Sequence, residues 1–331
     1  MMNSDIFLKI KQNDNLLFSK LNKKDLLELV YYISLFCPTL RENIGLTSDD
    51  TFGLEIEFEN IKNKALLGIN MEDNYPEWMF KADLSLFKGA EVCSPCMRDE
   101  RKNWMDLLNV CEIIKRNATI GNRSGGHIHV GAQIFDGIPD YLIRFIKLWS
   151  VYENVIFRFA YGEYLSGRMS IREYASPCSL TLWDNYEIMS SMGKIDLDDI
   201  LNLVTGTKRS QAVNFKNVRD IANLSDHNTV EFRCPNGTMN AIVWQNNVNF
   251  FVKLLKCSKS IQYDDDIIMR RRSINKDIYS DLKMYDEIFL EQALELADMV
   301  FSNNIDKVYF LHQYLKQFDI SNDCKKKVRS L

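Results

Sequence analysis

The chain has 331 residues, of which 46% are hydrophobic and 26% are charged, and its formal net charge is −4. This balance is typical of a soluble globular protein, and the negative charge argues against a general attraction to nucleic acid. Charged residues interrupt the most apolar stretch, residues 141–160, so no run is suited to span a membrane. We therefore expect neither a nucleic-acid nor a membrane partner.

The predicted elements divide the chain into three parts. Residues 1–48 form a helical N-terminal extension with a stripe of leucines. Residues 49–258 form a domain in which short strands, at about 51–59, 78–87, 89–95, 125–134, 212–215 and 229–234, alternate with helices. These helices are expected at about 99–117, 139–162, 180–205 and 237–257. Residues 259–331 form a helical C-terminal extension, whose charged stretch at 264–272 is interpreted as a solvated linker.

The eight cysteines are scattered, and several have apolar neighbours, which is typical of free thiols in a reducing, cytoplasmic environment. The N-terminus lacks the apolar core of a secretory signal. Cys93 and Cys96 have the spacing of a metal or redox pair, but no second pair accompanies them. A strand ending at Pro95 is the favoured interpretation, with Cys96 and Cys234 expected in the core.

Three predicted strands carry ionisable side chains two residues apart, separated by apolar residues. These pairs are Glu55 and Glu57, His127 and His129, and Glu231 and Arg233. Residues i and i+2 of a strand point to the same face, so each strand offers one apolar face and one charged face. If the three strands lie in one sheet, their charged face is suited to metal ions and phosphate.

Two further acids, Asp83 and Glu91, follow the first strand. Several carboxylates on one face are unfavourable unless cations neutralise them. Oxygen ligands with one imidazole suit Mg²⁺ or Mn²⁺ better than zinc, and two such ions often clamp phosphate oxygens. Gly125 and Gly126, just before the histidine pair, allow backbone N–H groups to approach an anion closely. Arg233, beside a metal-bound glutamate, could stabilise charge that develops in phosphoryl transfer.

Each pair also has a purely structural interpretation. The two glutamates of the first strand could lie on an exposed sheet edge, and the histidines could be satisfied by hydrogen bonds within the sheet. Glu231 and Arg233 could form a cross-strand salt bridge. The same pattern on three strands, together with Asp83 and Glu91, favours a joint site over three separate explanations.

The ordered motifs of residues 50–256 resemble those of the amidoligase family, which belongs to the glutamine synthetase and glutamate–cysteine ligase superfamily of carboxylate–amine ligases. The matching segments are GLEIEFE at 53–59, DLSLFKGAEVCSP at 83–95, SGGHIHVG at 124–131, the region of Arg168 and Tyr174, AVNF at 212–215 and TVEFRCPNGTMN at 229–240. The resemblance implies an α+β fold with a curved, mostly antiparallel sheet and helices on its outer face. ATP and two or three Mg²⁺ ions would bind the concave face.

The resemblance also implies roles for individual side chains. One ion, nearer the carboxylate substrate, would be held by Glu57, Asp83 and Glu91. A second ion, bridging the β- and γ-phosphates, would be held by Glu55, His129 and Glu231, although strand alternation allows His127 in place of His129. The catalytic set would be Glu57, Glu231, Arg233 and Arg168, and contacts to ATP would come from Glu55, His127, Arg209 and Arg233.

The implied reaction forms an amide through an acyl phosphate made from ATP and a substrate carboxylate. It needs no nucleophilic Ser or Cys, and the sequence contains no GxSxG, HExxH, GxxxxGK[ST] or GxGxxG motif. The expected partners are a small-molecule or peptide carboxylate and an amine, whose identities the sequence does not specify. The alternatives are a metal-dependent hydrolase that uses the His127 and His129 pair, and a non-catalytic nucleotide-binding protein of the same fold.

Overall fold

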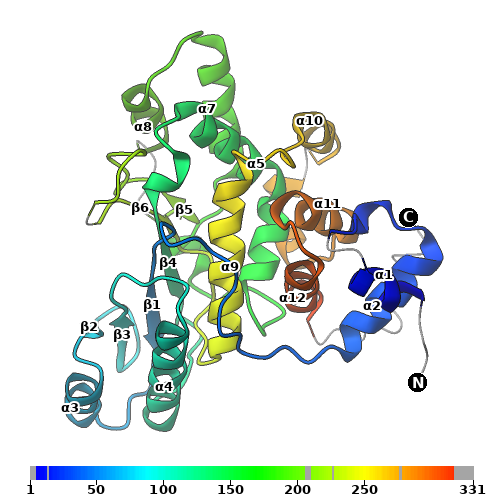
Figure 1. Ribbon diagram of the computed structural model, residues 1–331. Helices are drawn as coiled ribbons and strands as arrows, with labels where there is room; N and C mark the ends of the chain where they lie inside the picture. Colours follow the sequence, from blue (N-terminus) through cyan, green and yellow to red (C-terminus); the bar gives the residue numbers. More distant parts are fainter. Residues whose placement is uncertain (1–4, 13–14, 206–209, 226, 276–277, 317–331) are drawn as a thin grey trace.

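The computed structural model describes residues 5–12, 15–205, 210–225, 227–275 and 278–316 (Figure 1). Six strands of these residues form one open antiparallel sheet in the order β2-β3-β1-β4-β6-β5. The strands are β1 (Phe52–Phe58), β2 (Met79–Asp83), β3 (Gly89–Cys93), β4 (Gly126–Gly131), β5 (Val213–Asn214) and β6 (Thr229–Phe232). The α+β class and the antiparallel sheet expected from the sequence are confirmed.

Helices surround this sheet and extend well beyond it (Figure 1). Those before and within the sheet are α1 (Asp5–Gln12), α2 (Lys23–Leu35), α3 (Lys64–Asn74), α4 (Arg101–Asn117), α5 (Pro139–Ala160), α6 (Ile171–Tyr174), α7 (Ser179–Ser191) and α8 (Leu197–Thr205). Those after it are α9 (Ala241–Cys257), α10 (Asp265–Ile274), α11 (Leu290–Val300) and α12 (Asn304–Leu315). Within the described part of the chain, every helix is too short or too polar to span a lipid bilayer.

The three strands with paired ionisable residues are neighbours, because β1 pairs with β4 and β4 pairs with β6. Alternation along them divides the sheet into two faces. Leu54, Ile56, Ile128 and Val230 are at most 1% exposed and point to the apolar face. The opposite face therefore carries the charged residues of all three strands, as the pattern predicts.

Aromatic side chains join the apolar face to α4, α5 and α9. Phe52 of β1 stacks on Trp104 of α4, with ring centroids 5.1 Å apart. Phe232 of β6 stacks on Phe251 of α9 at 4.3 Å and on Trp149 of α5 at 5.6 Å. Helices α11 and α12 pack behind α5 and α9, so a single hydrophobic cluster contains residues from both ends of the chain. The boundaries near residues 48 and 258 stay predictions.

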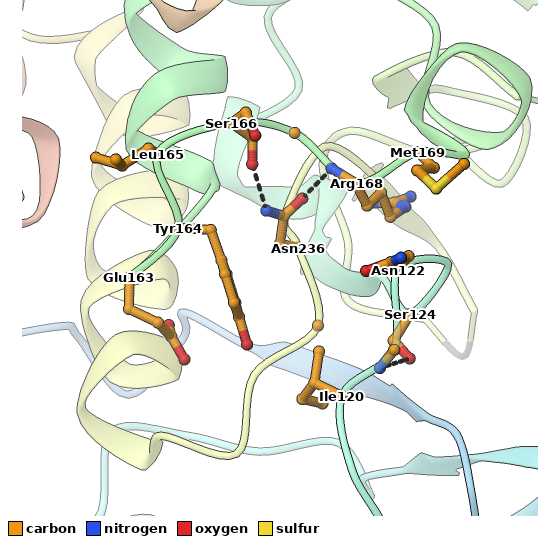
Figure 2. Close-up of a pocket in the computed structure, with 13 residues that line it drawn as sticks. Ile120, Asn122, Ser124, Glu163, Tyr164, Leu165, Ser166, Arg168, Met169 and Asn236 are labelled. Carbon is orange, nitrogen blue, oxygen red and sulfur yellow. Dashed lines mark hydrogen bonds between the residues drawn. The ribbon is translucent and has the colours of Figure 1, made fainter.

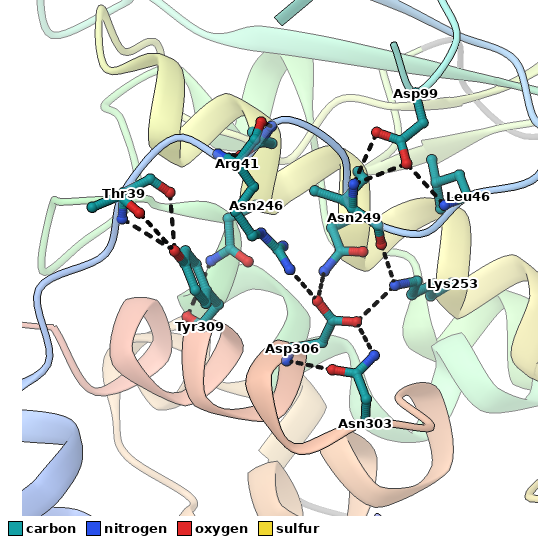
Figure 3. A network of polar contacts seen from close by, with 12 residues as sticks. Thr39, Arg41, Leu46, Asp99, Asn246, Asn249, Lys253, Asn303, Asp306 and Tyr309 are labelled. Carbon is teal, nitrogen blue, oxygen red and sulfur yellow. Dashed lines mark hydrogen bonds and ion pairs between the residues drawn. The ribbon is translucent and has the colours of Figure 1, made fainter. Parts of the chain in front are cut away.

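A polar network holds the segment between α2 and β1 against α9 and α12 (Figure 3). Asp306 of α12, only 1% exposed in its side chain, accepts hydrogen bonds from Arg41 at 2.6 Å, Lys253 at 2.7 Å and Asn249 at 2.8 Å. We call these four residues the Asp306 clamp. It fixes the chain directly upstream of the central strand β1.

Several expectations about the segments around the sheet are wrong. The charged stretch at 264–272 is not a solvated linker but contains α10, whose Arg271 is buried and paired with Glu295 at 2.8 Å. Helix α3 occupies a region expected to consist of strands and loops, and α2 ends at Leu35. Cys96 is exposed rather than in the core, whereas Cys234 is buried as expected.

Candidate functional site

Strand pairing brings the predicted acids and histidines together on the polar face of the sheet. The directly opposed pairs are Glu55 and His127, Glu57 and Glu91, and His129 and Glu231. Because opposed residues of antiparallel strands point to the same side, all six side chains share this face. Asp83 lies at the end of the edge strand β2.

Two groups of three side chains have ligand atoms within 4.8 Å of one another. The first group consists of Glu55, His129 and Glu231, and the second of Glu57, Asp83 and Glu91. The structure thus assembles the members of each predicted metal site. Their roles as ligands stay predictions, which the proposal below takes up.

The two histidines occupy different places relative to these groups. His129 Nε2 lies 3.2 Å from Glu55 Oε1, and its Nδ1 lies 3.1 Å from Thr229 Oγ1. His127 is buried, and its Nδ1 lies 2.5 Å from Glu55 Oε2. Its Nε2 makes no hydrogen bond and lies 3.5 Å from Glu57 Oε1. His127 therefore lies between the two groups, whereas His129 belongs to the first.

Electrostatic effects separate the acids into two kinds. Burial raises the pKa of Glu55, but hydrogen bonds and charge from His127 and His129 outweigh it and hold that pKa far below its ordinary value. The pKa of Glu231 is also lowered, because positive neighbours led by His127 outweigh burial. The pKa of Glu91 is raised by burial and by the negative charge of Glu55. Positive neighbours therefore favour the ionised form of Glu55 and Glu231, whereas burial and a neighbouring acid disfavour it in Glu91.

Two arginines border the acids. Arg233 donates from Nη1 to the Glu231 carboxylate and from Nε to the Tyr174 carbonyl at 2.9 Å. Arg168 is buried and donates to the carbonyl oxygens of Pro235 at 2.5 Å and of Arg233 at 3.0 Å. Burial lowers the pKa of Arg168. Arg209, also predicted to contact ATP, lies outside the described residues.

The acids, histidines and arginines line a cavity of about 370 Å³. Sequence reasoning gave no role to five of its lining residues, which are Lys81, Ser85, Arg123, Tyr174 and Asn217. For Lys81 a signal was present, because it alternates with Asp83 on one strand, and its Nζ lies 3.6 Å from Glu91 Oε1. Asn214, which donates to Glu231 Oε2 at 2.8 Å, was given no role, although it alternates with Val213 and Phe215 in the strand expected at 212–215.

A larger cavity of about 880 Å³ lies beside the first (Figure 2). Both cavities are lined by Arg168. The walls of the larger one come from the turn after α5, the residues before β4 and Asn236 with Gly237 after β6. These segments meet at the end of the sheet where strand β1 ends and strand β4 begins.

Comparison with known families adds one finding. A family model described as "Putative amidoligase enzyme" matches residues 71–255, which is more than half of the 331 residues. The matched segment runs from α3 to α9 and includes β2 to β6, while β1 with Glu55 and Glu57 precedes it. No curated protein matches the chain.

Proposed function

The chain belongs to the amidoligase family, and from that premise we propose that it joins a carboxylate to an amine in an ATP-dependent reaction. The observation that carries the proposal is the pair of three-residue groups on one sheet face, with Arg233 beside them. A ligase of this kind must hold a highly charged triphosphate close to a second anion. Cation sites and arginines on a common surface meet that need.

The side chains of both groups fit Mg²⁺ or Mn²⁺. Together they offer five carboxylates and one imidazole, a donor set that suits hard divalent cations. The raised pKa of Glu91 reflects its burial and the negative charge of Glu55, so these acids crowd one another. Bound ions would relieve this crowding and polarise the phosphate oxygens of ATP. In this proposal Glu57, Asp83 and Glu91 hold one ion, and Glu55, His129 and Glu231 hold the other.

Neighbouring groups orient these acids before any ligand arrives. The Gly125 N–H donates to Glu57 Oε2 at 2.6 Å, and His127 fixes Glu55. Asn214 and Arg233 each contact one oxygen of Glu231. Such fixed partners limit the reorganisation needed during the reaction, which is the main source of electrostatic catalysis.

The proposed reaction has two steps. A substrate carboxylate oxygen attacks the γ-phosphorus of ATP, and the bond from this phosphorus to the β,γ-bridging oxygen breaks. The products of this step are ADP and an acyl phosphate. The amine nitrogen then attacks the acyl carbon, the carbon–oxygen bond to phosphate breaks, and the nitrogen loses a proton. Arg233 stabilises the transferring phosphoryl group, and Arg168, whose guanidinium is bonded to carbonyl oxygens, contacts phosphate or substrate carboxylate.

Trapping of the intermediate tests the proposal. The full chain is incubated with ATP, Mg²⁺, hydroxylamine and a panel of amino-acid and peptide carboxylates. Because hydroxylamine captures acyl phosphates, we expect ADP and a hydroxamate to form in equal amounts, and only when a carboxylate is present. ADP release at a rate that does not depend on the added carboxylate would contradict the proposal. Hydrolysis of substrates without ATP would also contradict it and would favour a hydrolase.

A further inference from the structure

The segment after β6 shapes the larger cavity. Asn236 accepts a hydrogen bond from the Arg168 N–H at 2.9 Å through its side-chain oxygen, and its amide donates to the Ser166 carbonyl at 3.0 Å (Figure 2). A Cβ on Gly237 would lie 2.9 Å from Ser124 Cβ, so glycine allows the two segments to approach closely. These contacts hold the turn after α5 in one shape. The cavity is therefore a built feature of the fold.

This turn presents one oriented carboxylate to the cavity. Thr238, a buried residue, donates from its hydroxyl to Glu163 Oε1 at 2.7 Å and accepts from the Asn240 N–H at 3.0 Å. Among the described residues, Glu163 forms no ion pair with a lysine, arginine or histidine within 4.0 Å. The nearby Lys316 donates to the Gly162 carbonyl instead, at 2.6 Å. The Glu163 carboxylate thus has a fixed orientation, and one side of it faces the cavity.

The remaining walls of the cavity are suited to the apolar part of an organic ligand. Ile120, Tyr164 and Leu165 line it, and Tyr164 and Leu165 are 39% and 57% exposed. Glu163 and Arg168 lie on opposite sides of the cavity (Figure 2). Arg168 directs its recorded hydrogen bonds to carbonyl oxygens, so it does not neutralise Glu163. A volume of about 880 Å³ is large for ammonia and within the range of pockets that hold organic ligands.

We propose that the larger cavity binds a primary ammonium compound with an apolar or aromatic body. Glu163 pairs with the ammonium group, and Tyr164 with its apolar neighbours contacts the body. The carboxylate favours a cation over a neutral molecule of the same shape, whereas the ring contacts the apolar body that both molecules share. Binding of this compound does not depend on the proposed function and can be measured independently of it.

Two probes with the same body test the site. Dissociation constants of 2-phenylethylammonium and of the neutral 2-phenylethanol are measured on the full chain by ligand-observed NMR. We expect wild type to bind the ammonium probe about fivefold more tightly than the alcohol, as for a partly exposed ion pair. Glu163→Gln should remove this preference without weakening the alcohol. Tyr164→Ala should weaken both probes to a similar extent.

Glu112→Gln provides the matched control, because Glu112 lies on α4, outside the cavity, and pairs with Lys115 at 3.4 Å. This variant should keep the wild-type preference. Equal binding of the two probes to wild type, or a preference that survives Glu163→Gln, would overturn the proposal. If the preference depends on Glu163 but no hydroxamate forms with any carboxylate, the ammonium site stands and the ligase function fails.

Discussion

Two charged clusters of this protein have opposite balances. In the Asp306 clamp, one buried carboxylate is matched by Arg41 and Lys253 and also accepts from an asparagine. On the polar face of the sheet, five carboxylates lie close together. Among the described residues, ion pairs with lysine or arginine reach only Glu91 and Glu231 of these five. The carboxylate of the clamp is thus paired within the fold, whereas in the proposed function the sheet face also binds cations from outside.

A similar contrast exists between two acids near the end of β1. Glu59 follows Glu57 by two residues and is equally an acid next to β1. Its oxygens, however, accept from the backbone N–H groups of Phe87 at 2.8 Å and Arg123 at 3.4 Å. Glu59 thereby joins two loops, as a buried polar group with its own partners does. Glu59 therefore serves the fold, although it continues the alternation of Glu55 and Glu57 in the sequence.

The largest expected effect belongs to the clamp. Asp306→Asn leaves Arg41 and Lys253 without their carboxylate in a largely buried environment, so we expect a loss of about 3–5 kcal/mol in the free energy of unfolding. Urea denaturation measures this loss, and Asp140→Asn at an exposed position serves as the control. ADP formation per folded molecule should not change. A small change in stability would show that the clamp is not the structural counterpart of the site.

Removal of negative charge from the sheet face should affect activity more than stability. Glu55→Gln and Glu231→Gln keep the size of the side chain but lose the negative charge that a cation site requires. We expect ADP formation to fall by about 10²–10³-fold in each variant. Circular dichroism should show a folded protein, and rates are compared per folded molecule because the histidines and Arg233 lose carboxylate partners in these variants. Wild-type rates of ADP formation in either variant would argue against the proposed metal group.

External cations should stabilise one cluster and not the other. Binding of Mn²⁺ to the native state alone adds about 2.7 kcal/mol of stability at a concentration of 100 times its Kd. We therefore expect Mn²⁺ to raise the Tm of wild type and of Asp306→Asn by similar amounts. The rise should be much smaller in the double variant with Glu55→Gln and Glu231→Gln. An equal rise in all three proteins would place the binding of Mn²⁺ elsewhere.

The predictable part of this molecule follows from period-two patterns. Alternation in β1, β4 and β6 fixes which side chains share a face, and antiparallel neighbours bring Glu55, His127 and Glu231 together. No such pattern marks α3, where Leu67 and Met71 are the buried residues and exposed apolar side chains blur the stripe. The larger cavity was also unpredictable, because three segments distant in sequence build it.

Helix α10 shows how one charge pattern supports two interpretations. Blocks of like charge are typical of solvated linkers. Here the acidic block lies at the N-terminus, where Asp264 caps the helix by accepting from the Ile267 N–H, and Arg271 and Arg272 occupy the last turn. Both placements complement the helix dipole, and Arg271 gains a buried partner in Glu295. The decisive partner is distant in sequence, so composition alone favoured the wrong interpretation.

Arg233→Lys tests the cation that the sheet face does contain. Lysine keeps the positive charge but lacks the planar guanidinium. It therefore cannot contact Glu231, the Tyr174 carbonyl and a phosphate oxygen at the same time. We expect phosphoryl transfer to slow by about 10–100-fold, with a smaller change in affinity for ATP. Single-turnover ADP formation and equilibrium binding of ATP separate the two effects. Equal losses in both would assign Arg233 to binding alone.

The smallest expected effect is for a substitution at Gly125, which binds Glu57 and lies close to Arg168. A Cβ at Gly125 would lie 2.6 Å from Arg168 Cζ, and the N–H of the same residue holds Glu57. At Gly53, on the neighbouring strand, a Cβ would meet only ordinary contacts at 3.8 Å.

Gly125→Ala should therefore displace Arg168 and reduce ADP formation by about tenfold, because small misplacements of catalytic groups lower the rate. Gly53→Ala should retain near wild-type activity, which makes it the matched control. Equal activity of the two variants would show that the position of Arg168 is unimportant, and the sheet face would then depend on its acids and Arg233 alone.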